Sequence, residues 1–264
     1  MNIQLSKIFR NASFGLSFLA CFSTPAWSAE RDWSDSMNFD HAGFSDGSAL
    51  MTLGRFQVES GMEFTSETAV TNWLARFGLF DWMELRFEVP SIVTTYESPS
   101  VYQVDALESG VKIALYETEE LQLSVLPYLM FPAGSIVSAA EVISPGLELL
   151  TDVSLVEDFT FSFGVYSRAL GRRDALREND VFTIDTTLAT AITWSVTKQF
   201  GLVGDAWYTF QDLFGEASLS PTPGADVAVY YMFTPDLALD VYAGATFTAD
   251  KTYSFGGFGL SARL

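Results

Sequence analysis

Apolar and polar residues alternate one by one along most of this chain, from Thr52 to its end. The stretch FTFSFGVYS, which begins at Phe159, shows the pattern plainly, with phenylalanines at every second position and small or polar residues between them. Successive side chains of a β-strand point to opposite faces, so this period predicts strands with one apolar and one polar face. No stretch shows a convincing helical period of 3.6. The fold is therefore predicted to be all-β.

Short polar turns divide the alternating region at intervals of about 40 residues, and each interval holds two strand-length segments joined by a longer polar connection. Short turns at one end and longer loops at the other are typical of bacterial outer-membrane barrels, which have an even number of strands. The pattern predicts a single closed antiparallel up-and-down transmembrane β-barrel of about twelve strands. The predicted strands are 53–65, 69–79, 83–92, 102–116, 121–132, 144–154, 159–167, 181–195, 200–211, 223–233, 237–248 and 253–264.

Three other folds agree less well with the sequence than the barrel does. A solenoid or propeller would need a strong repeated motif, whereas the repeat here is only a hairpin. A soluble β-sandwich, with its large apolar residues inside and its polar face wet, stays an alternative. A membrane-spanning helix is disfavoured because the longest uncharged stretch, 121–140, contains Pro127, Pro132 and Gly134. Since proline cannot donate to a strand ladder, a local bulge is expected at Pro127.

Acidic residues outnumber basic ones by 33 to 14, which gives a formal net charge of −19. This balance argues against nucleic acid as a partner, because phosphates require a basic face. Yet only 18% of the residues are charged, while 48% are hydrophobic and 15% aromatic. A soluble acidic protein would carry more charge and fewer rings. The composition therefore indicates a large apolar surface that must be covered.

The first residues have the features of a secretory signal peptide. Lys7 and Arg10 precede the apolar run FGLSFLACF, and AWS then places small residues before a cut at Ala29. A lipoprotein cut at Cys21 is the rival. Cys21 is the single cysteine of the sequence, so the mature chain has no thiol although it enters an oxidising compartment.

These features predict three regions: a cleaved signal peptide at 1–28, an N-terminal periplasmic extension at 29–51 and the outer-membrane barrel at 52–264. The extension is polar, dotted with aromatic residues and aperiodic. The protein is predicted to be exported through the periplasm to the cell outer membrane, where the lipid bilayer is its solvent.

The charged residues of the barrel fall on the face opposite the apolar one. A charge in lipid is costly, so we expect them to line the lumen, as ion pairs that rigidify the wall or as part of a polar path. Read from the alternation, the set is Arg55, Glu59, Glu63, Arg76, Glu84, Arg86, Glu88, Glu108, Lys112, Glu148, Asp152, Asp185, Asp205, Asp226, Asp240 and Arg263.

The opening of the barrel region, GRFQVESGMEFT at 54–65 and WLARFGLFDWMELRFEVP at 73–90, resembles the outer-membrane transporter-like family of the MetA pathway of phenol degradation. The matching positions are Gly54, Arg55, Phe56, Gln57, Glu59, Arg76, Gly78, Leu79, Asp81, Glu84, Leu85 and Arg86. The resemblance extends over roughly residues 50–264 and implies an outer-membrane barrel that passes aromatic or other small hydrophobic compounds. Phe77 and Phe80 depart from the family pattern, which more often has Tyr and a polar residue there.

No catalytic, cofactor or metal site is predicted. The single histidine, His41, precedes the barrel and has no partner motif, and no Gly-x-Ser-x-Gly elbow occurs. The predicted function is a passive channel for small molecules, selected by lumen width, wall charge and loops. The alternative is a structural or surface-interaction barrel whose lumen is plugged, with residues 30–50 as the plug.

The last strand, YSFGGFGLSARL, is predicted to close the barrel against the first strand. Phe258 and Leu264 are expected to face lipid, and Ser261 and Arg263 the lumen. The barrel assembly machinery of the outer membrane is an expected partner, although its substrates usually end in an aromatic residue and this chain ends in leucine.

Overall fold

A computed structural model describes residues 33, 36–38, 40, 45–96, 102–104, 106–132, 142–174, 179–212 and 221–264 of the chain. The predicted signal peptide, 1–28, lies outside the described residues. Trp33 to Leu264 belong to one compact unit. Within the described ranges, no helix is long and apolar enough to cross a membrane.

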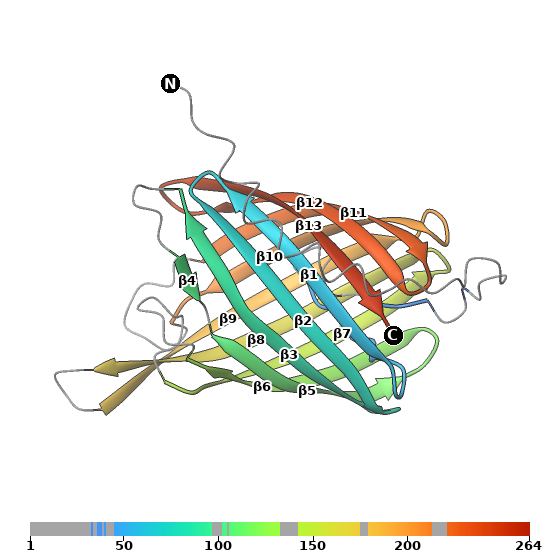
Figure 1. The fold of residues 1–264 in the computed structure, drawn as a ribbon, viewed down its shortest axis with the longest axis horizontal. Helices are drawn as coiled ribbons and strands as arrows, with labels where there is room; N and C mark the ends of the chain where they lie inside the picture. Colours follow the sequence, from blue (N-terminus) through green and yellow to red (C-terminus); the bar gives the residue numbers. More distant parts are fainter. Residues whose placement is uncertain are drawn as a thin grey trace, which may run out of the picture. The chain divides into compact units, whose positions relative to one another are not determined.

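The described chain consists of antiparallel β-strands joined by turns and loops (Figure 1). Their residues are rich in β-branched and aromatic side chains at alternate positions, which suits a pleated surface with one face buried. The strands are β1 (Phe56–Thr65), β2 (Thr68–Phe80), β3 (Met83–Thr95), β4 (Tyr102–Val104), β5 (Leu107–Glu117), β6 (Leu121–Phe131), β7 (Ser144–Val156), β8 (Phe159–Asp174), β9 (Asn179–Trp194), β10 (Phe200–Phe210), β11 (Thr222–Thr234), β12 (Leu237–Phe247) and β13 (Thr252–Arg263).

The sheet closes on itself, because β1 pairs with β2 on one edge and with β13 on the other. The closing register runs from Gln57 opposite Arg263 to Thr65 opposite Phe255. Both β4 and β5 pair with β3, so they form one strand of the wall with a short interruption. The barrel therefore has twelve wall strands, and the predicted fold class is confirmed.

The two faces of the wall follow the predicted alternation. On β12, Val241 has 53% of its surface exposed, whereas Asp240 before it has 1%. On β13, Phe258 is exposed while Ser261 and Arg263 are buried toward the lumen, and Leu264, which follows the strand, is exposed. The outer face is thus apolar and matches a bilayer, and the pairing of β1 with β13 joins the two ends of the sheet as a span through lipid requires.

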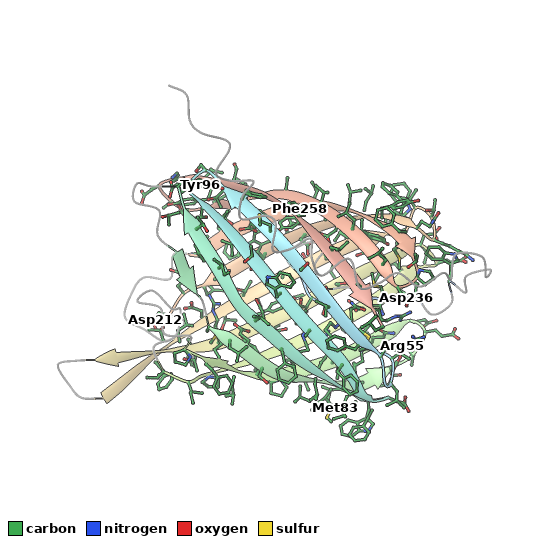
Figure 2. All side chains as sticks on the ribbon, in the orientation of Figure 1. Arg55, Met83, Tyr96, Asp212, Asp236 and Phe258 are labelled. Atoms are coloured by element: carbon green, nitrogen blue, oxygen red, sulfur yellow. The ribbon has the colours of Figure 1, made fainter. Side chains whose placement is uncertain are left out.

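Aromatic rings gather on the outside near the short turns. Phe80 stacks on Trp82, and Phe159 stacks on Trp194, each pair with ring centroids 5.5 Å apart. Amphipathic rings at headgroup level form the girdles of outer-membrane barrels. Figure 2 places Met83 at this turn end of the barrel, with Tyr96 at the opposite, loop end.

The bulge predicted at Pro127 is absent. The register between β5 and β6 is the same before and after the proline, and two ladder pairs are simply missing beside it. Pro127 is exposed on the outer face and keeps its position opposite Leu147 of β7. The register shift of this hairpin lies instead between Ala114 and Tyr116, next to the short turn. Because proline has no N–H to donate, ladder pairs with β5 are lost beside Pro127, but the register between β5 and β6 does not change.

The described residues just before β1 fold into the lumen from the turn end. We call the described residues 36–38, 40 and 45–51 the inner segment. At its start, Met37 packs with Met232 and Ala238, and its N–H donates to the carbonyl of Pro235 at 2.9 Å. Residues 30–50 were considered above as a plug, and the described part of that stretch lies inside the barrel.

Gly78 of β2 lies against the chain backbone at the end of the inner segment. A Cβ at this position would meet the carbonyl oxygens of Thr52 at 2.2 Å and Met51 at 2.7 Å. These are backbone atoms, so they cannot rotate away. We expect Gly78→Ala to destabilise the barrel by about 1–3 kcal/mol, the usual effect of overpacking. Urea titration in vesicles with a folded/unfolded gel readout measures this effect.

Gly204 offers the matched control for this substitution. It also lies in a wall strand, yet a Cβ there would meet nothing within 4 Å. Gly204→Ala should leave the urea midpoint unchanged or slightly raised. Equal midpoints for the two alanine variants would contradict the close approach at Gly78.

Candidate functional site

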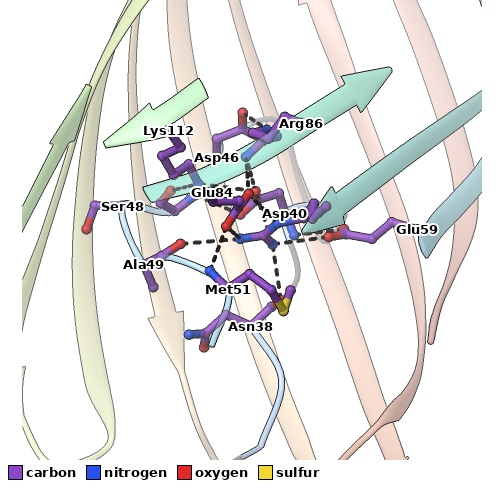
Figure 3. Close-up of polar contacts among 12 residues, drawn as sticks. Asn38, Asp40, Asp46, Ser48, Ala49, Met51, Glu59, Glu84, Arg86 and Lys112 are labelled. Atoms are coloured by element: carbon purple, nitrogen blue, oxygen red, sulfur yellow. Dashed lines mark hydrogen bonds and ion pairs between the residues drawn. The ribbon is translucent and has the colours of Figure 1, made fainter. Parts of the chain in front are cut away.

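The candidate site is the barrel lumen, where the inner segment meets the charged wall (Figure 3). The wall side chains come from strands β1, β2, β3 and β5, and they are Glu59, Arg76, Glu84, Arg86 and Lys112. The inner segment supplies two carboxylates, Asp40 and Asp46, and several backbone groups. The result is a buried network of ion pairs and hydrogen bonds.

Arg76 on β2 is the centre of this network. Its Nε lies 2.8 Å from Glu84 Oε1 and its Nη1 lies 3.2 Å from Glu59 Oε1, with all three side chains buried. The same guanidinium donates to the carbonyl oxygens of Asn38 at 3.2 Å and Ala49 at 3.3 Å. The guanidinium of arginine is planar and carries several N–H donors. This one side chain therefore contacts β1, β3 and two separate parts of the inner segment.

Asp40 is held by three wall cations. Its Oδ2 accepts a short hydrogen bond from Arg86, and it lies 3.3 Å from Arg76 Nη1 and 3.4 Å from Lys112 Nζ. Its own N–H donates to Glu59 Oε2 at 2.9 Å. Because buried charges need partners, this carboxylate anchors the segment firmly to the wall.

Asp46 and its neighbours extend the network across the lumen. Arg86 Nη2 pairs with Asp46 Oδ2 at 3.2 Å, and the N–H of Asp46 donates to the hydroxyl of Tyr166 on β8 at 2.9 Å. Ser45 N–H donates to Asp205 Oδ1 on β10 at 3.1 Å. The inner segment thus reaches from the β1–β5 side of the wall to the opposite side.

Ser48 forms the third attachment. Its N–H and its hydroxyl both donate to Asp152 Oδ2 of β7, at 2.6 Å and 2.8 Å. Further along, Met51 N–H donates to Glu84 Oε2 at 2.6 Å. A segment without regular secondary structure must satisfy its backbone groups elsewhere, and here wall carboxylates accept these N–H bonds. The need to accept hydrogen bonds from these backbone N–H groups explains why many acidic side chains of the wall face the inner segment.

The inner segment separates two sets of cavities. On the loop side lies a cavity of about 570 Å³, bordered by Asp40, Asp46 and the wall. On the turn side lie cavities of about 380 Å³ and 210 Å³, which border Gly47 and Leu50 respectively. The lumen is therefore hollow at both ends and interrupted in the middle by residues that are not part of the wall.

Most of the predicted lumen-lining residues lie on the inner face. Residues that border the loop-side cavity are Glu63, Arg86, Glu88, Glu108, Asp185 and Asp226. Residues buried on the lumen face are Glu59, Arg76, Lys112, Asp205, Asp240 and Arg263. Arg55 differs: β1 begins only at Phe56, so Arg55 lies in the preceding turn with an exposed side chain and is outside the strand alternation.

Sequence reasoning missed Asp40 and Asp46, which stand in the aperiodic segment and carry no pattern of their own. It also missed the aromatic residues of the cavity, among them Tyr128, Trp207 and Phe255. Their positions alternate with the outer apolar set, so the period-two rule could have placed these rings on the lumen face. Within the described residues, no group of three His, Cys, Asp or Glu side chains could hold a metal ion. His41 lies outside the described residues.

The pKa of Asp40 is set by burial and by three cations of the wall. Burial alone would raise the pKa of Asp40, but Arg76, Lys112 and Arg86 outweigh it and hold that pKa well below the usual value of 3.8. A carboxylate with a lowered pKa stabilises the docked state above its ordinary pKa and loses this contribution only as the pH falls through the lowered value.

We therefore expect the docking contribution of Asp40 to be constant from about pH 7 to about pH 5 and to shrink only below its ordinary range. The measurement compares the open fraction of wild type and Asp40→Asn in bilayer recordings over this pH series. A difference between the two proteins that disappears near neutral pH would contradict the ion-pair account.

A closed barrel with an apolar belt, aromatic girdles and a charged lumen defines an outer-membrane β-barrel, embedded in the lipid bilayer of the outer membrane. Residues 39–264 match the family described as "Putative MetA-pathway of phenol degradation", and the chain belongs to that family. The match begins within the stretch that folds into the lumen. No curated protein sequence matches the chain.

Solved structures share the fold. The COG4313 outer membrane channel from Pseudomonas putida F1 superposes with a TM-score of 0.62 at 10% identity, covering 86% of this chain and 100% of that one. The NanC porin gives a TM-score of 0.60 at 11% identity, covering 79% and 100%. The KdgM porin bound to disordered oligogalacturonate gives 0.54 at 10% identity, covering 77% and 97%. Identities this low establish a common architecture only.

Proposed function

We propose that the protein is a passive outer-membrane channel for small aromatic or hydrophobic molecules, with no energy coupling, enzymatic activity or cofactor of its own. The observation that carries the proposal is the hollow lumen, interrupted by a segment that is not part of the wall and is held to it by hydrogen bonds and ion pairs. Rings such as Tyr128, Trp207 and Phe255 border the loop-side cavity and suit aromatic solutes. The channel and porin folds named above support the same reading.

In this proposal the inner segment is the gate. While it is docked, the cavities on its two sides are separated, and solute passes when its contacts with the wall open. The alternative function, a structural barrel that never conducts, is favoured by the same docked segment. The two functions differ in whether undocking of the segment produces a conducting path.

A reversible cross-link tests the channel. Ser48 Oγ lies 2.8 Å from Asp152 Oδ2, so cysteines at both positions can be joined by a short cross-linker that forms a disulfide bond with each thiol. Cys21, the single native cysteine, lies in the predicted signal peptide. In planar bilayers we expect openings from the reduced protein, silence after cross-linking, and recovery with dithiothreitol.

The single variants Ser48→Cys and Asp152→Cys, treated with the same reagent, are the controls. A cross-linked protein that conducts like the reduced one would exclude the segment as the gate. Silence in every state, together with no acceleration of solute entry into liposomes, would favour the structural barrel.

The outer-membrane assembly machinery is proposed as the partner that inserts the barrel. Leu264 is 59% exposed on the lipid face, and its N–H donates to the carbonyl of Phe56 at 2.8 Å in the closing seam. We expect Leu264→Phe to increase the folded yield in the outer membrane, because it supplies the aromatic end that such substrates usually have. Leu260→Phe adds a ring on the same strand, and an equal gain from it would argue against recognition of the last residue.

The boundaries 1–28, 29–51 and 52–264 are proposed for the signal peptide, the N-terminal segment and the barrel. Sequencing the N-terminus of the purified protein tests the first boundary, with Ala29 as the expected first residue.

A further inference from the structure

One side of the loop-side cavity combines aromatic rings with carboxylates. Trp207 on β10, Tyr242 on β12 and Phe255 on β13 border it together with Glu63 of β1 and Asp226 of β11. We call these five residues the aromatic recess. They come from neighbouring strands across the closing seam and form a continuous patch of the inner wall.

The rings of the recess lie against glycines of adjacent strands. A Cβ at Gly224 would meet the indole of Trp207 at 2.2 Å, and a Cβ at Gly257 would meet the ring of Tyr242 at 2.5 Å. The centroid of Phe255 lies 6.1 Å from that of Trp207 and 6.3 Å from that of Tyr242. Glycine thus lets the Trp207 and Tyr242 rings lie close to the neighbouring strands, and both rings still border the cavity.

Asp226 is the carboxylate of the recess that has a buried oxygen without a hydrogen-bond partner among the described residues. Its side chain is only 6% exposed, and its Oδ1 has no hydrogen-bond partner among the described residues. In the sheet register it stands directly opposite Asp205 of β10. Like charges in opposite positions of a ladder destabilise it, and a buried carboxylate requires compensation. A cation beside Asp226 would reduce the repulsion between the two carboxylates and would compensate the buried charge of Asp226.

The wall around the recess selects for positive charge. The lining of the loop-side cavity contains eight carboxylates but only two guanidiniums, those of Arg86 and Arg168. Of these, Arg86 pairs with Asp40 and Asp46, so six carboxylates and the guanidinium of Arg168 remain outside these pairs. An anion entering from the loop end therefore meets an unfavourable field, whereas a cation is attracted.

We propose that the aromatic recess binds an organic cation, an amine or quaternary ammonium ion that carries an aromatic or alkyl group. The ammonium lies against the faces of Trp207 and Tyr242 and beside Asp226, and the apolar group occupies the cavity. Ring faces attract organic cations through their quadrupole. A bare metal ion fits less well, because no group of three potential ligands converges among the described residues. The inference rests on the proposed channel and names the charge class of its solute.

Calorimetric titration of the purified folded protein tests the site, with benzyltrimethylammonium as the cation, benzyl alcohol as the neutral analogue and benzoate as the anion. We expect the cation to bind at least about tenfold more tightly than benzyl alcohol, and benzoate not to bind. Asp226→Asn should weaken cation binding about tenfold and Trp207→Leu about fivefold, with little change for benzyl alcohol. Asp226→Asn removes a repulsive pair, so this variant should fold.

Two variants that leave the recess intact serve as controls. Asp158→Asn removes a carboxylate from an exposed short turn, and Tyr208→Leu removes the outward-facing ring next to Trp207. Both should bind the cation as wild type does. Equal affinities for benzyltrimethylammonium and benzyl alcohol, or a cation affinity that Asp226→Asn leaves unchanged, would overturn the proposal. The latter result would mean that a proton shared with Asp205, rather than a ligand, neutralises the carboxylate pair.

The experiments distinguish failure of the binding-site proposal from failure of the channel proposal. If the reduced cysteine pair at 48 and 152 conducts but the cation does not bind preferentially, the channel stands and the recess is only part of its wall. If the cation binds but no state of the barrel conducts, the recess is a ligand site on a structural barrel and the channel is excluded.

Discussion

Replacing Arg76 by alanine is expected to lower the free energy of unfolding of the barrel by about 3–5 kcal/mol, the usual effect of removing one partner from a buried charge cluster. The guanidinium lies within 3.3 Å of Glu84, Glu59 and Asp40, and its side chain has no exposed surface. Without it, three carboxylates face one another in a space from which water is largely excluded. Repulsion among them and the loss of their shared partner act in the same direction.

The measurement is the urea midpoint of folded protein in vesicles, read from the different gel migration of folded and unfolded barrels. Arg76→Lys should recover part of the loss, because lysine restores the charge but cannot donate in the same planar fork. Arg55→Ala is the matched control, since Arg55 is an arginine in the exposed turn before β1. A midpoint for Arg76→Ala equal to that of Arg55→Ala would contradict the network described here.

The double substitution Asp40→Ala and Asp46→Ala is expected to convert a mostly closed protein into a mostly conducting one. Asp40 pairs with Arg76, Arg86 and Lys112, and Asp46 pairs with Arg86. Loss of a buried pair amounts to about 3–5 kcal/mol, so the equilibrium between docked and released segment should shift by more than about a hundredfold. Once the segment leaves, the wall cations are solvated and need no partner.

Open probability in planar bilayers measures the shift, and the rate of solute entry into liposomes should rise with it. Glu119→Ala with Asp158→Ala removes two carboxylates from exposed short turns and should leave conductance unchanged. Because Glu59 and Glu84 keep Arg76 as a partner, the barrel of the Asp40 and Asp46 variant should lose less stability than Arg76→Ala. An unfolding midpoint as low as that of Arg76→Ala, with no gain in conductance, would show that the segment supports the wall and does not gate it.

The strands of the wall and their two faces could be predicted because both depend on residues that are close together in the sequence. The period-two alternation of β12 assigns Val241 to lipid and Asp240 to the lumen, since the pleat of a strand admits no other arrangement. The even strand number and the short turns predict that the first strand pairs with the last. The register of β1 and β13 confirms this prediction. The prediction failed at Pro127, where the ladder lost bonds without a bulge, and at Arg55, which precedes the first strand.

The contents of the lumen depend on partners far apart in sequence. The N–H of Ser45 is satisfied by Asp205, 160 residues later, and Ser48 by Asp152, 104 residues later. The described residues of the inner segment form no hydrogen-bond ladder of their own, so their conformation is set by the donors and acceptors that surround them. The sequence by itself determined a closed barrel and the two faces of its strands, because both follow from backbone geometry and the polarity of lipid. Only the tertiary structure decided that the N-terminal segment docks in the lumen, because barrel closure brings the distant wall charges within reach of Asp40 and Asp46.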